Sequence, residues 1–266
     1  MADVWGSYKA RVGTMGATRR DRAIKNTQHY LYRKLPASPS WSEVTIDGIR
    51  QAVSITDQKD SMAKKKICSM PGEKLKHGGL VDFANSKWII TETDANDEVY
   101  AKGFMQRCNY LLKWLDENGT VIEKWSIVED GTKYLIGEKA EDMMAIGDAR
   151  VAVTIAKDDD TVKLKRGKRF LIDDVDSESV LAFQITKPNK LYNVYDGDGI
   201  YRFILNEVEL TDNDNTDLRI ADYYSWKPKI PKDNDHKNPD ISLGEIIDDA
   251  RKKAEEDDDN NKEVWL

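Results

Sequence analysis

The fold of this 266-residue chain is decided by the stretch Gly78-Gly79-Leu80-Val81-Asp82-Phe83-Ala84-Asn85-Ser86-Lys87-Trp88-Ile89-Ile90-Thr91-Glu92-Thr93. Its two β-rich runs, Leu80–Phe83 and Trp88–Thr93, are separated by small polar residues. Runs of β-branched and aromatic residues divided in this way are typical of a β-hairpin. The stretch therefore predicts two antiparallel strands joined by a tight turn.

A second hairpin is predicted immediately downstream. Met105–Leu115 and Val121–Val128 are rich in apolar and aromatic residues, and Asp116-Glu117-Asn118-Gly119 separates them. Asn118-Gly119 is a strong hairpin signal because both residue types tolerate the positive φ of primed turns. From Gly78 to Tyr134 the sequence thus predicts an antiparallel meander with tryptophans on its strands.

The residues before the meander add further strands. Val44–Ile49 and Gln51–Thr56 alternate between apolar and polar residues, which favours β-structure. Lys64-Lys65-Lys66 is interpreted as a basic insertion between strands. Together with the meander, these runs predict a small β-barrel domain over residues 43–146.

A second β region follows the first. Short alternating runs separated by turn residues are typical of a β-sandwich of immunoglobulin-like architecture, although the Cys-Trp-Cys signature of true immunoglobulin domains is absent. We therefore predict an Ig-like β-sandwich over residues 147–226 and a fold that is mainly β. The runs are Val151–Ile155, Lys168–Ile172, Leu181–Ile185, Leu191–Tyr195, Ile200–Leu205 and Glu207–Leu210.

Both ends of the chain carry helical signals. Arg19–Leu35 places Ile24, Thr27, Gln28, Leu31 and Leu35 near one stripe, and prolines stop the pattern, so residues 1–42 are expected to form an N-terminal helical arm. Residues 227–266 begin as a linker rich in Pro, Lys, Asp and Asn. Beyond it, the capping-box spacing of Ser242–Glu245 and a narrow apolar stripe up to Ala254 predict a short C-terminal helix.

Charge is distributed unevenly along the chain. Met1–Pro36 contains eight basic and two acidic residues, Asp233–Leu266 contains five basic and twelve acidic residues, and residues 1–232 as a whole are neutral. This layout suits contacts with charged surfaces on neighbouring subunits or with nucleic acid. Arg19, Arg20 and Arg22 are the candidate contacts in the basic arm. Both partners remain open at this point, and we favour subunit contact.

The chain ends with Trp265-Leu266 after a run of acidic residues. Two interpretations are open for this pair. It is either a disordered end or an anchor that docks in a pocket or on a sheet of a partner. Trp265 and Leu266 are therefore also candidate partner contacts.

Motifs of catalysis and metal binding are absent from the sequence. His29, His77 and His236 lie far apart, and there is no nucleophile elbow, phosphate-binding loop or zinc-protease motif. Asp212–Asp217 offers oxygen ligands at alternate positions but lacks the glycine and the glutamate of a calcium loop, so a solvated loop is expected. We predict no enzyme activity, no catalytic residue, no cofactor and no metal.

Other composition features exclude further classes of protein. Cys68 and Cys108 are expected to be free thiols because a chain of this size folds without disulfides. No apolar run approaches the roughly 20 residues that a membrane helix needs, and no secretory signal is visible, so no membrane contact is expected.

Several segments resemble structural proteins from the head-tail gene clusters of tailed phages and prophages of Gram-positive bacteria. The hairpin Gly79–Ile90 in particular resembles the core hairpin of head-closure (stopper) connector proteins, which are β-barrels that form a ring between the portal-adaptor complex and the tail. The segments that carry the resemblance are Val44–Ile49, Gly79–Ile90, Gln106–Trp114, Glu129–Tyr134 and Asn206–Val208.

The resemblance implies a protein of the virion, made in the bacterial host cytoplasm. It implies a homo-oligomeric ring, of six or twelve copies, that binds portal-adaptor and tail proteins and contacts packaged DNA. A tail terminator and a capsid or tail decoration protein are alternatives in the same setting. A cytosolic nucleic-acid-binding protein is a further alternative from a different class.

Overall fold

The computed structural model describes residues 4–16, 18–59, 61–130, 150–173 and 179–226. These residues belong to one compact unit, Met1–Lys227. The second unit, Pro228–Leu266, lies outside the described residues, and with it the predicted linker, the acidic tail and the helix expected over residues 242–254.

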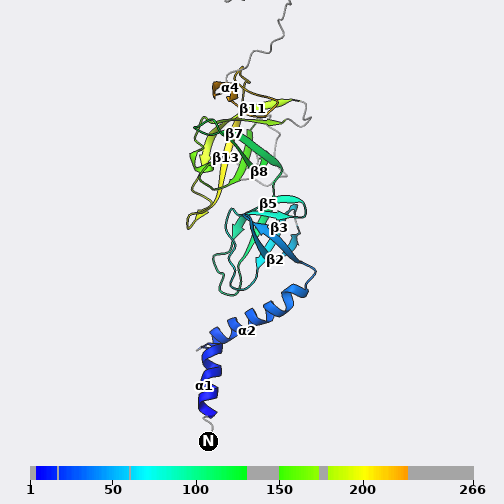
Figure 1. The fold of residues 1–266 in the computed structure, drawn as a ribbon, viewed down its shortest axis with the longest axis vertical. Helices are drawn as coiled ribbons and strands as arrows, with labels where there is room; N and C mark the ends of the chain where they lie inside the picture. The colour runs from blue at the N-terminus through cyan, green and yellow to red at the C-terminus, as the bar shows by residue number, and fades with distance from the viewer. Residues whose placement is uncertain (1–3, 17, 60, 131–149, 174–178, 227–266) are drawn as a thin grey trace, which may run out of the picture. The chain divides into compact units, whose positions relative to one another are not determined.

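The described chain is mainly β, as the sequence predicts. Its first six strands form a closed barrel in the order β1-β2-β3-β6-β5-β4, and β1 pairs with β4 to close it. Figure 1 shows these strands in blue to cyan. The strands are β1 Trp41–Ile46, β2 Ile49–Gln58, β3 Ser61–Ser69, β4 Leu80–Phe83, β5 Ser86–Thr93 and β6 Lys102–Arg107.

The barrel interior is filled by side chains. Val53, Ile67, Val81, Ile90 and Met105 are completely buried and belong to one apolar cluster. They come from five of the six strands, because alternate residues of each strand point inward. The barrel is therefore a packed core and not a channel.

Two turns of the barrel use left-handed backbone conformations. The predicted hairpin of β4 and β5 turns at Ala84-Asn85, where both φ angles are positive (49° and 55°). Asp47-Gly48 does the same between β1 and β2 (49° and 84°). The expected run Val44–Ile49 is therefore interrupted by a primed turn, which the Asp-Gly pair encodes.

The lysine run is part of a strand and not an insertion. Lys64, Lys65 and Lys66 lie in β3, which pairs with β2 on one side and β6 on the other. Lys65 reaches Trp88 at the rim of the barrel, with its ammonium 5.8 Å from the ring centre. The long aliphatic stem of lysine permits such a position on a barrel wall.

The remaining strands form a second sheet in the order β10-β11-β13-β9-β8-β7, with β12 beside β13. It appears in green to yellow in Figure 1. The strands are β7 Tyr110–Leu115, β8 Val121–Asp130, β9 Arg150–Ala156, β10 Arg169–Asp173, β11 Val180–Asn189, β12 Val194–Tyr195 and β13 Asp198–Val208.

This second region is one strongly curved sheet where two facing sheets of an Ig-like sandwich were expected. Its two end strands approach each other, since the Tyr110 hydroxyl on β7 donates to the Leu171 carbonyl on β10 at 3.3 Å. Trp114, Phe170 and Phe203 pack together inside the curve. The sheet curls because one continuous set of antiparallel pairings runs from β7 to β10, and its apolar face must cover itself.

The boundary between the two β regions differs from the prediction. β7 and β8, expected within the 43–146 barrel domain, belong to the second sheet. The expected single strand Met105–Leu115 breaks at Cys108-Asn109 into β6 and β7. The Asn109 side-chain amide exchanges two hydrogen bonds, of 2.7 and 2.8 Å, with the Val128 backbone, and thereby replaces a strand residue at the crossing.

The N-terminal helical arm is confirmed and contains two helices, α1 Val4–Met15 and α2 Arg19–Lys34. α2 begins with a capping box in which Thr18 and Asp21 exchange side-chain-to-backbone hydrogen bonds of 3.1 Å each. A 3-10 turn, η1 Leu35–Ala37, leads into β1. The other short helices are η2 Thr161–Lys163 and α4 Tyr223–Trp226, the last being a short helix at the C-terminal end of the described residues.

Candidate interaction surfaces

One face of α2 contacts loops of the barrel domain. Ile24, Gln28, Leu31 and Leu35 are half-buried, which matches most of the predicted stripe, whereas Thr27 is exposed. The Gln28 side chain donates to the Glu98 carbonyl at 2.8 Å. These contacts hold the helix against the loop between β5 and β6.

Two polar contacts at the ends of α2 reinforce this attachment. Arg20 forms an ion pair with Glu98, and the Tyr32 hydroxyl donates to the Pro71 carbonyl at 2.6 Å. Of the three predicted contact arginines, Arg20 thus binds the barrel of its own chain.

The opposite face of α2 is basic and aromatic. At 100° per residue, Arg19, Arg22, Tyr30 and Arg33 lie about half a turn away from the buried stripe. All four are exposed. We call these residues the arm face. Arg19 and Arg22 are therefore placed together and available, as the sequence prediction requires, while Trp265 and Leu266 lie outside the described residues.

The barrel and the second sheet meet backbone to backbone at two glycines. A Cβ added to Gly78 would stand 2.0 Å from the Gly199 carbonyl oxygen, so no side chain fits there. Beside this point, Ile89, Cys108, Ile127 and Ile200 form a buried apolar cluster that draws on both sheets. The two lobes of the described unit are thus in direct contact.

His77 and Tyr195 stack next to the paired glycines. Their ring centres are 5.5 Å apart and the planes differ by 17°. His77 is only 6% exposed, and its Nε2 lies 2.9 Å from the Thr91 carbonyl, which can only accept a hydrogen bond. Nε2 therefore carries the proton, and the stack fixes the position of the Tyr195 ring.

A groove of about 1090 Å³ runs along this junction. Five carboxylates and two ammonium groups line it, in addition to His77 and Tyr195. Tyr195, which is 61% exposed, is part of one wall, and Leu191 and Tyr192, 86% and 77% exposed, directly precede that wall in the chain. We call this the junction groove. Its charged lining residues are Lys74, Lys76, Glu92, Asp94, Asp97, Asp196 and Asp198.

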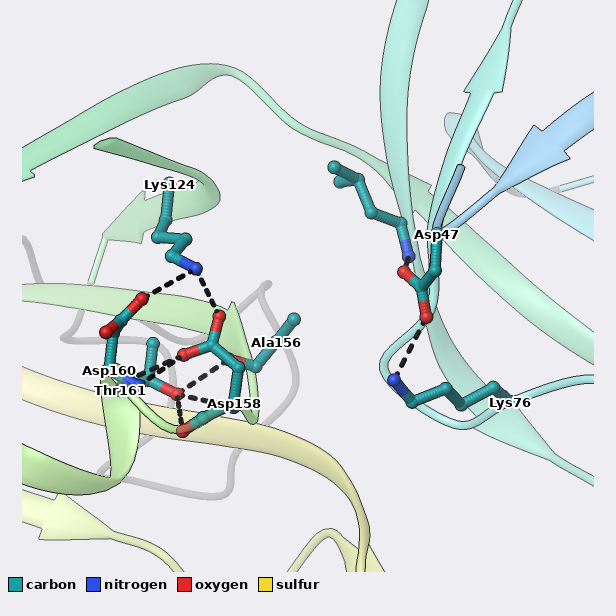
Figure 2. A network of polar contacts seen from close by, with 8 residues as sticks. Asp47, Lys76, Lys124, Ala156, Asp158, Asp160 and Thr161 are labelled. Carbon is teal, nitrogen blue, oxygen red and sulfur yellow. Dashed lines mark hydrogen bonds and ion pairs between the residues drawn. The ribbon is translucent and has the colours of Figure 1, made fainter. Parts of the chain in front are cut away.

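Ion pairs fix the loops near the groove, and Figure 2 shows two of these clusters. Lys124 bridges Asp158 and Asp160 at 2.7 and 3.0 Å, and Lys76 binds Asp47 at 3.0 Å. Burial alone would raise the pKa of Asp158, but Lys124 and the hydrogen bonds from Thr161 outweigh it and hold that pKa below its ordinary value. The hydrogen bond to Asp47 raises the pKa of Lys76, so this ammonium stays charged.

The loop considered as a calcium site is occupied by an arginine. The Arg169 guanidinium binds both carboxylate oxygens of Asp214, at 3.0 and 2.8 Å, and Asp222 at 2.8 Å. Asp214 also accepts the backbone N–H groups of Thr211 and Asp222. In the described part of the chain, no group of three or more His, Cys, Asp or Glu side chains is arranged to hold a metal ion.

Both cysteines are free, as expected. Cys108 is buried at the junction, and this burial raises the pKa of its thiol to about 12. Cys68 is half-buried, and desolvation raises its pKa as well. Across the ranges that the structure describes, no helix is long and apolar enough to span a membrane.

The sequence did not indicate the junction groove. Gly78 and Gly199 meet across about 120 positions of sequence, and nothing local signals that contact. Two signals were nonetheless readable. Leu191, Tyr192 and Tyr195 form an apolar cluster in a segment rich in turn residues, and Asp196 and Asp198 follow directly.

Comparison with known proteins finds one family. Residues 18–107 match the model of the YomX N-terminal domain, which is a phage-derived (prophage) family. This part of the chain is therefore similar to a domain of a phage-derived family. The match starts at the cap of α2 and ends with the last barrel strand, so it covers the arm helix and the complete barrel.

Two further comparisons add little. No curated protein matches the chain. Among solved structures, it is similar to MrkH, described as a c-di-GMP-dependent transcription regulatory factor, at 12% identity and a TM-score of 0.23, over 71% of this chain and 85% of that one. A similarity of this size carries no argument about fold or function.

Proposed function

We propose that this protein is a non-enzymatic structural component of a tailed phage particle, where it joins the head to the tail as a head-closure ring. The match of the arm and barrel to a phage-derived family supports the phage setting. The packed, closed barrel supports a structural role, because such a barrel is a rigid body without free strand edges.

The arm face is the observation that carries the proposal. A closed barrel cannot associate by adding strands, so its assembly contacts must use side chains on its surface or on appended elements. α2 is held on the barrel by one face and presents Arg19, Arg22, Tyr30 and Arg33 on the other. An exposed basic and aromatic surface of this kind suits contact with another subunit.

In the proposed ring, six or twelve copies associate with one another. The portal-adaptor complex and tail proteins bind the two sides of the ring, and the arginines of the arm face are available to packaged DNA. The protein is then part of the virion and is made in the bacterial host cytoplasm. A tail terminator, or a capsid or tail decoration protein, is the alternative within the particle.

A nucleic-acid-binding protein is the second candidate function, and the arm face favours it. Three arginines on one exposed face match the electrostatic footprint of phosphate contacts. This candidate predicts DNA affinity that falls steeply with salt and is lost in a variant with Arg19, Arg22 and Arg33 changed to Ala. Affinity without a salt slope contradicts it.

The experiment that tests the proposed function is localisation in particles. The full-length chain is given a small epitope tag in the producing phage, and purified particles are examined by mass spectrometry and gold labelling. A head-closure protein gives a few copies per particle and label only at the head-tail junction. Label over the whole capsid or along the tail indicates decoration, and absence from particles contradicts the proposal.

A further inference from the structure

We infer that the junction groove binds the N-terminal arm of a second copy of this chain. The inference rests on the proposed ring and names the two surfaces that join neighbouring copies. Both surfaces are exposed, both combine charge with large apolar side chains, and their charges are opposite.

The groove offers the acceptor side of this contact. Among its charged residues, Asp94 pairs with Lys102 at 2.9 Å, and Lys76 pairs with Asp47. Glu92, Asp97, Asp196 and Asp198 are exposed carboxylates against the single remaining ammonium of Lys74. A cationic partner therefore gains more from the groove than an anionic one.

The apolar side chains of the groove are also unusual. Tyr195 lines the groove and is 61% exposed, and the exposed Leu191 and Tyr192 lie shortly before it in the chain, just outside the groove lining. Large apolar side chains that are exposed next to a groove favour an interaction site. Tyr195 is held from behind by its stack on His77, so its outer side is presented without loss of side-chain freedom on binding. A guanidinium stacks favourably on such a ring.

The arm supplies the matching donor side. Arg19, Arg22 and Arg33 present guanidinium groups, which form bidentate hydrogen bonds with carboxylates. Tyr30 on the same face, and the exposed Trp5 and Tyr8 on α1, supply aromatic surface. Residues 1–36 carry eight basic side chains and two acidic ones.

The geometry of α2 makes the contact intermolecular. Its half-buried stripe, together with Arg20 and Gln28, faces the barrel of its own chain. The arm face lies on the other side of the helix and is directed away from that barrel. The loop that α2 contacts also carries Asp94 and Asp97 of the groove, but the arm face is on the side of the helix opposite to this contact, so we assign it to the groove of a neighbouring copy.

A contact between an arm and a groove uses two different patches, so it is heterologous. Repeating a heterologous contact produces a closed ring when the rotation between copies closes, and a filament when it does not. Each copy then contributes one arm and one groove, so every copy in a closed ring makes two contacts. A copy at the end of an open filament makes only one. This is the arrangement that a head-closure ring requires.

Charge reversal on full-length protein tests the inference. The arm variant carries Arg19→Glu and Arg22→Glu, which are compatible with the first turns of a helix because acidic residues are favourable there. The groove variant carries Asp97→Lys and Asp198→Lys. Asp196 is left unchanged because its φ of 51° disfavours lysine. The control variant, Asp212→Lys and Asp217→Lys, makes the same charge change on an exposed loop outside the groove.

Sedimentation velocity over a concentration series measures assembly, and circular dichroism checks folding. We expect the arm and groove variants each to weaken self-association at least tenfold, and the control variant to assemble like the unchanged protein. The variant that combines all four arm and groove changes regains assembly, because the reversed arm matches the reversed groove.

Three results would overturn the inference. The first is self-association that is unaffected by the arm and groove variants. The second is a combined variant that stays as weak as its parents. The third is an unchanged protein that remains monomeric throughout while its arm face binds DNA. In each case the localisation of the tagged protein in phage particles tests the proposed function separately. Failure of the arm–groove contact is therefore distinguishable from failure of the head-closure function.

Discussion

Arg169 shows how single side chains organise the second sheet. It stands on the end strand β10 and binds Asp214, Asp222, the Thr211 hydroxyl and the Glu209 carbonyl. The segment after β13 has little regular structure, and these bonds help to hold it on the sheet, together with the Arg219–Asp173 ion pair and the buried Ala221. The Asp214 side chain is almost completely buried, so its charge is stabilised by the Arg169 cation together with the backbone N–H groups of Thr211 and Asp222.

Replacing Arg169 with Met is therefore expected to destabilise the protein by about 3 kcal/mol, since it leaves a buried carboxylate without its cation. Urea unfolding monitored by fluorescence measures this as a lower midpoint at unchanged slope. Arg166→Met is the matched control, because Arg166 is exposed and a surface change of this kind costs less than about 0.5 kcal/mol. Equal effects of the two variants contradict the role of Arg169.

Asp214 predicts a dependence of stability on pH. Burial alone would raise its pKa, but hydrogen bonds from the Asp222 and Thr211 backbone and from Arg169 outweigh it and lower the pKa. A carboxyl group whose pKa is lower in the folded than in the unfolded protein stabilises the folded state. This contribution is complete at pH values above the unfolded pKa of about 3.9, and it is lost as the pH falls through the folded pKa. The stability gap between the unchanged protein and Asp214→Asn should thus be constant near neutral pH and shrink below about pH 4. A gap that widens in acid contradicts this assignment.

Cys108 predicts low thiol reactivity in the folded protein. With a thiol pKa of about 12, only about one molecule in ten thousand carries the thiolate at pH 8. Ellman's reagent should therefore modify Cys108 at a measurable rate only after unfolding, and Cys108→Ser should leave the signal of the native protein unchanged. Rapid modification of Cys108 in the native state would show that the junction opens readily.

At the scale of elements, the contact between the barrel and the second sheet depends on glycine. Gly78 has a φ of 81° and lies against the backbone of Gly199. Gly197 has a similar φ of 92°, but an added Cβ there would meet nothing within 4 Å. An alanine at Gly197 therefore introduces backbone strain alone, whereas an alanine at Gly78 introduces the same strain and a steric clash.

We expect Gly78→Ala to destabilise the protein by more than Gly197→Ala, whose cost is the backbone strain of about 1 kcal/mol. The extra cost at Gly78 arises because the Cβ forces the two backbones apart, and this disturbs the His77–Tyr195 stack. Thermal unfolding of both variants measures the difference. If the two variants unfold at the same temperature, the lobes are not in close contact at this point.

Local elements were predictable from sequence wherever a local signal existed. α2 was expected to begin at Arg19, where Thr18 caps it, and the β4–β5 hairpin was expected from its two runs and short polar turn. α1 was missed because its residues show no clear apolar stripe. The alternating pattern of Val44–Ile49 continues through the turn at Asp47-Gly48, although this Asp-Gly pair is itself typical of a primed turn.

What depends on long-range pairing was not predictable. Nothing near Cys108-Asn109 in the sequence signals that the chain leaves the barrel there. The strand ends because the Cys108 N–H donates to the Lys87 backbone carbonyl at 2.8 Å, whereas Asn109 already pairs with Val128 of the second sheet. The curled second sheet and the junction groove depend in the same way on residues far apart in sequence. The arginines of the arm can be identified from the sequence. Only the structure shows that Arg20 binds Glu98 of its own chain, while Arg19 and Arg22 lie on the exposed face.

The whole molecule combines a basic arm, a body of two β-lobes in which acidic residues outnumber basic ones, and an acidic C-terminal segment in sequence. The arm and the groove provide complementary surfaces within one chain, which favours assembly of identical copies. The assembled ring is more stable than a single contact between two copies, because each additional weak contact within the ring forms at high effective concentration.

The most direct test of the central claim is electron cryo-microscopy of tail-less phage capsids incubated with the purified full-length protein. The account predicts additional density as a ring at the single vertex that carries the portal, with none elsewhere on the shell. Density distributed over the whole capsid, or no bound density at protein concentrations at which the chain self-associates, would contradict it.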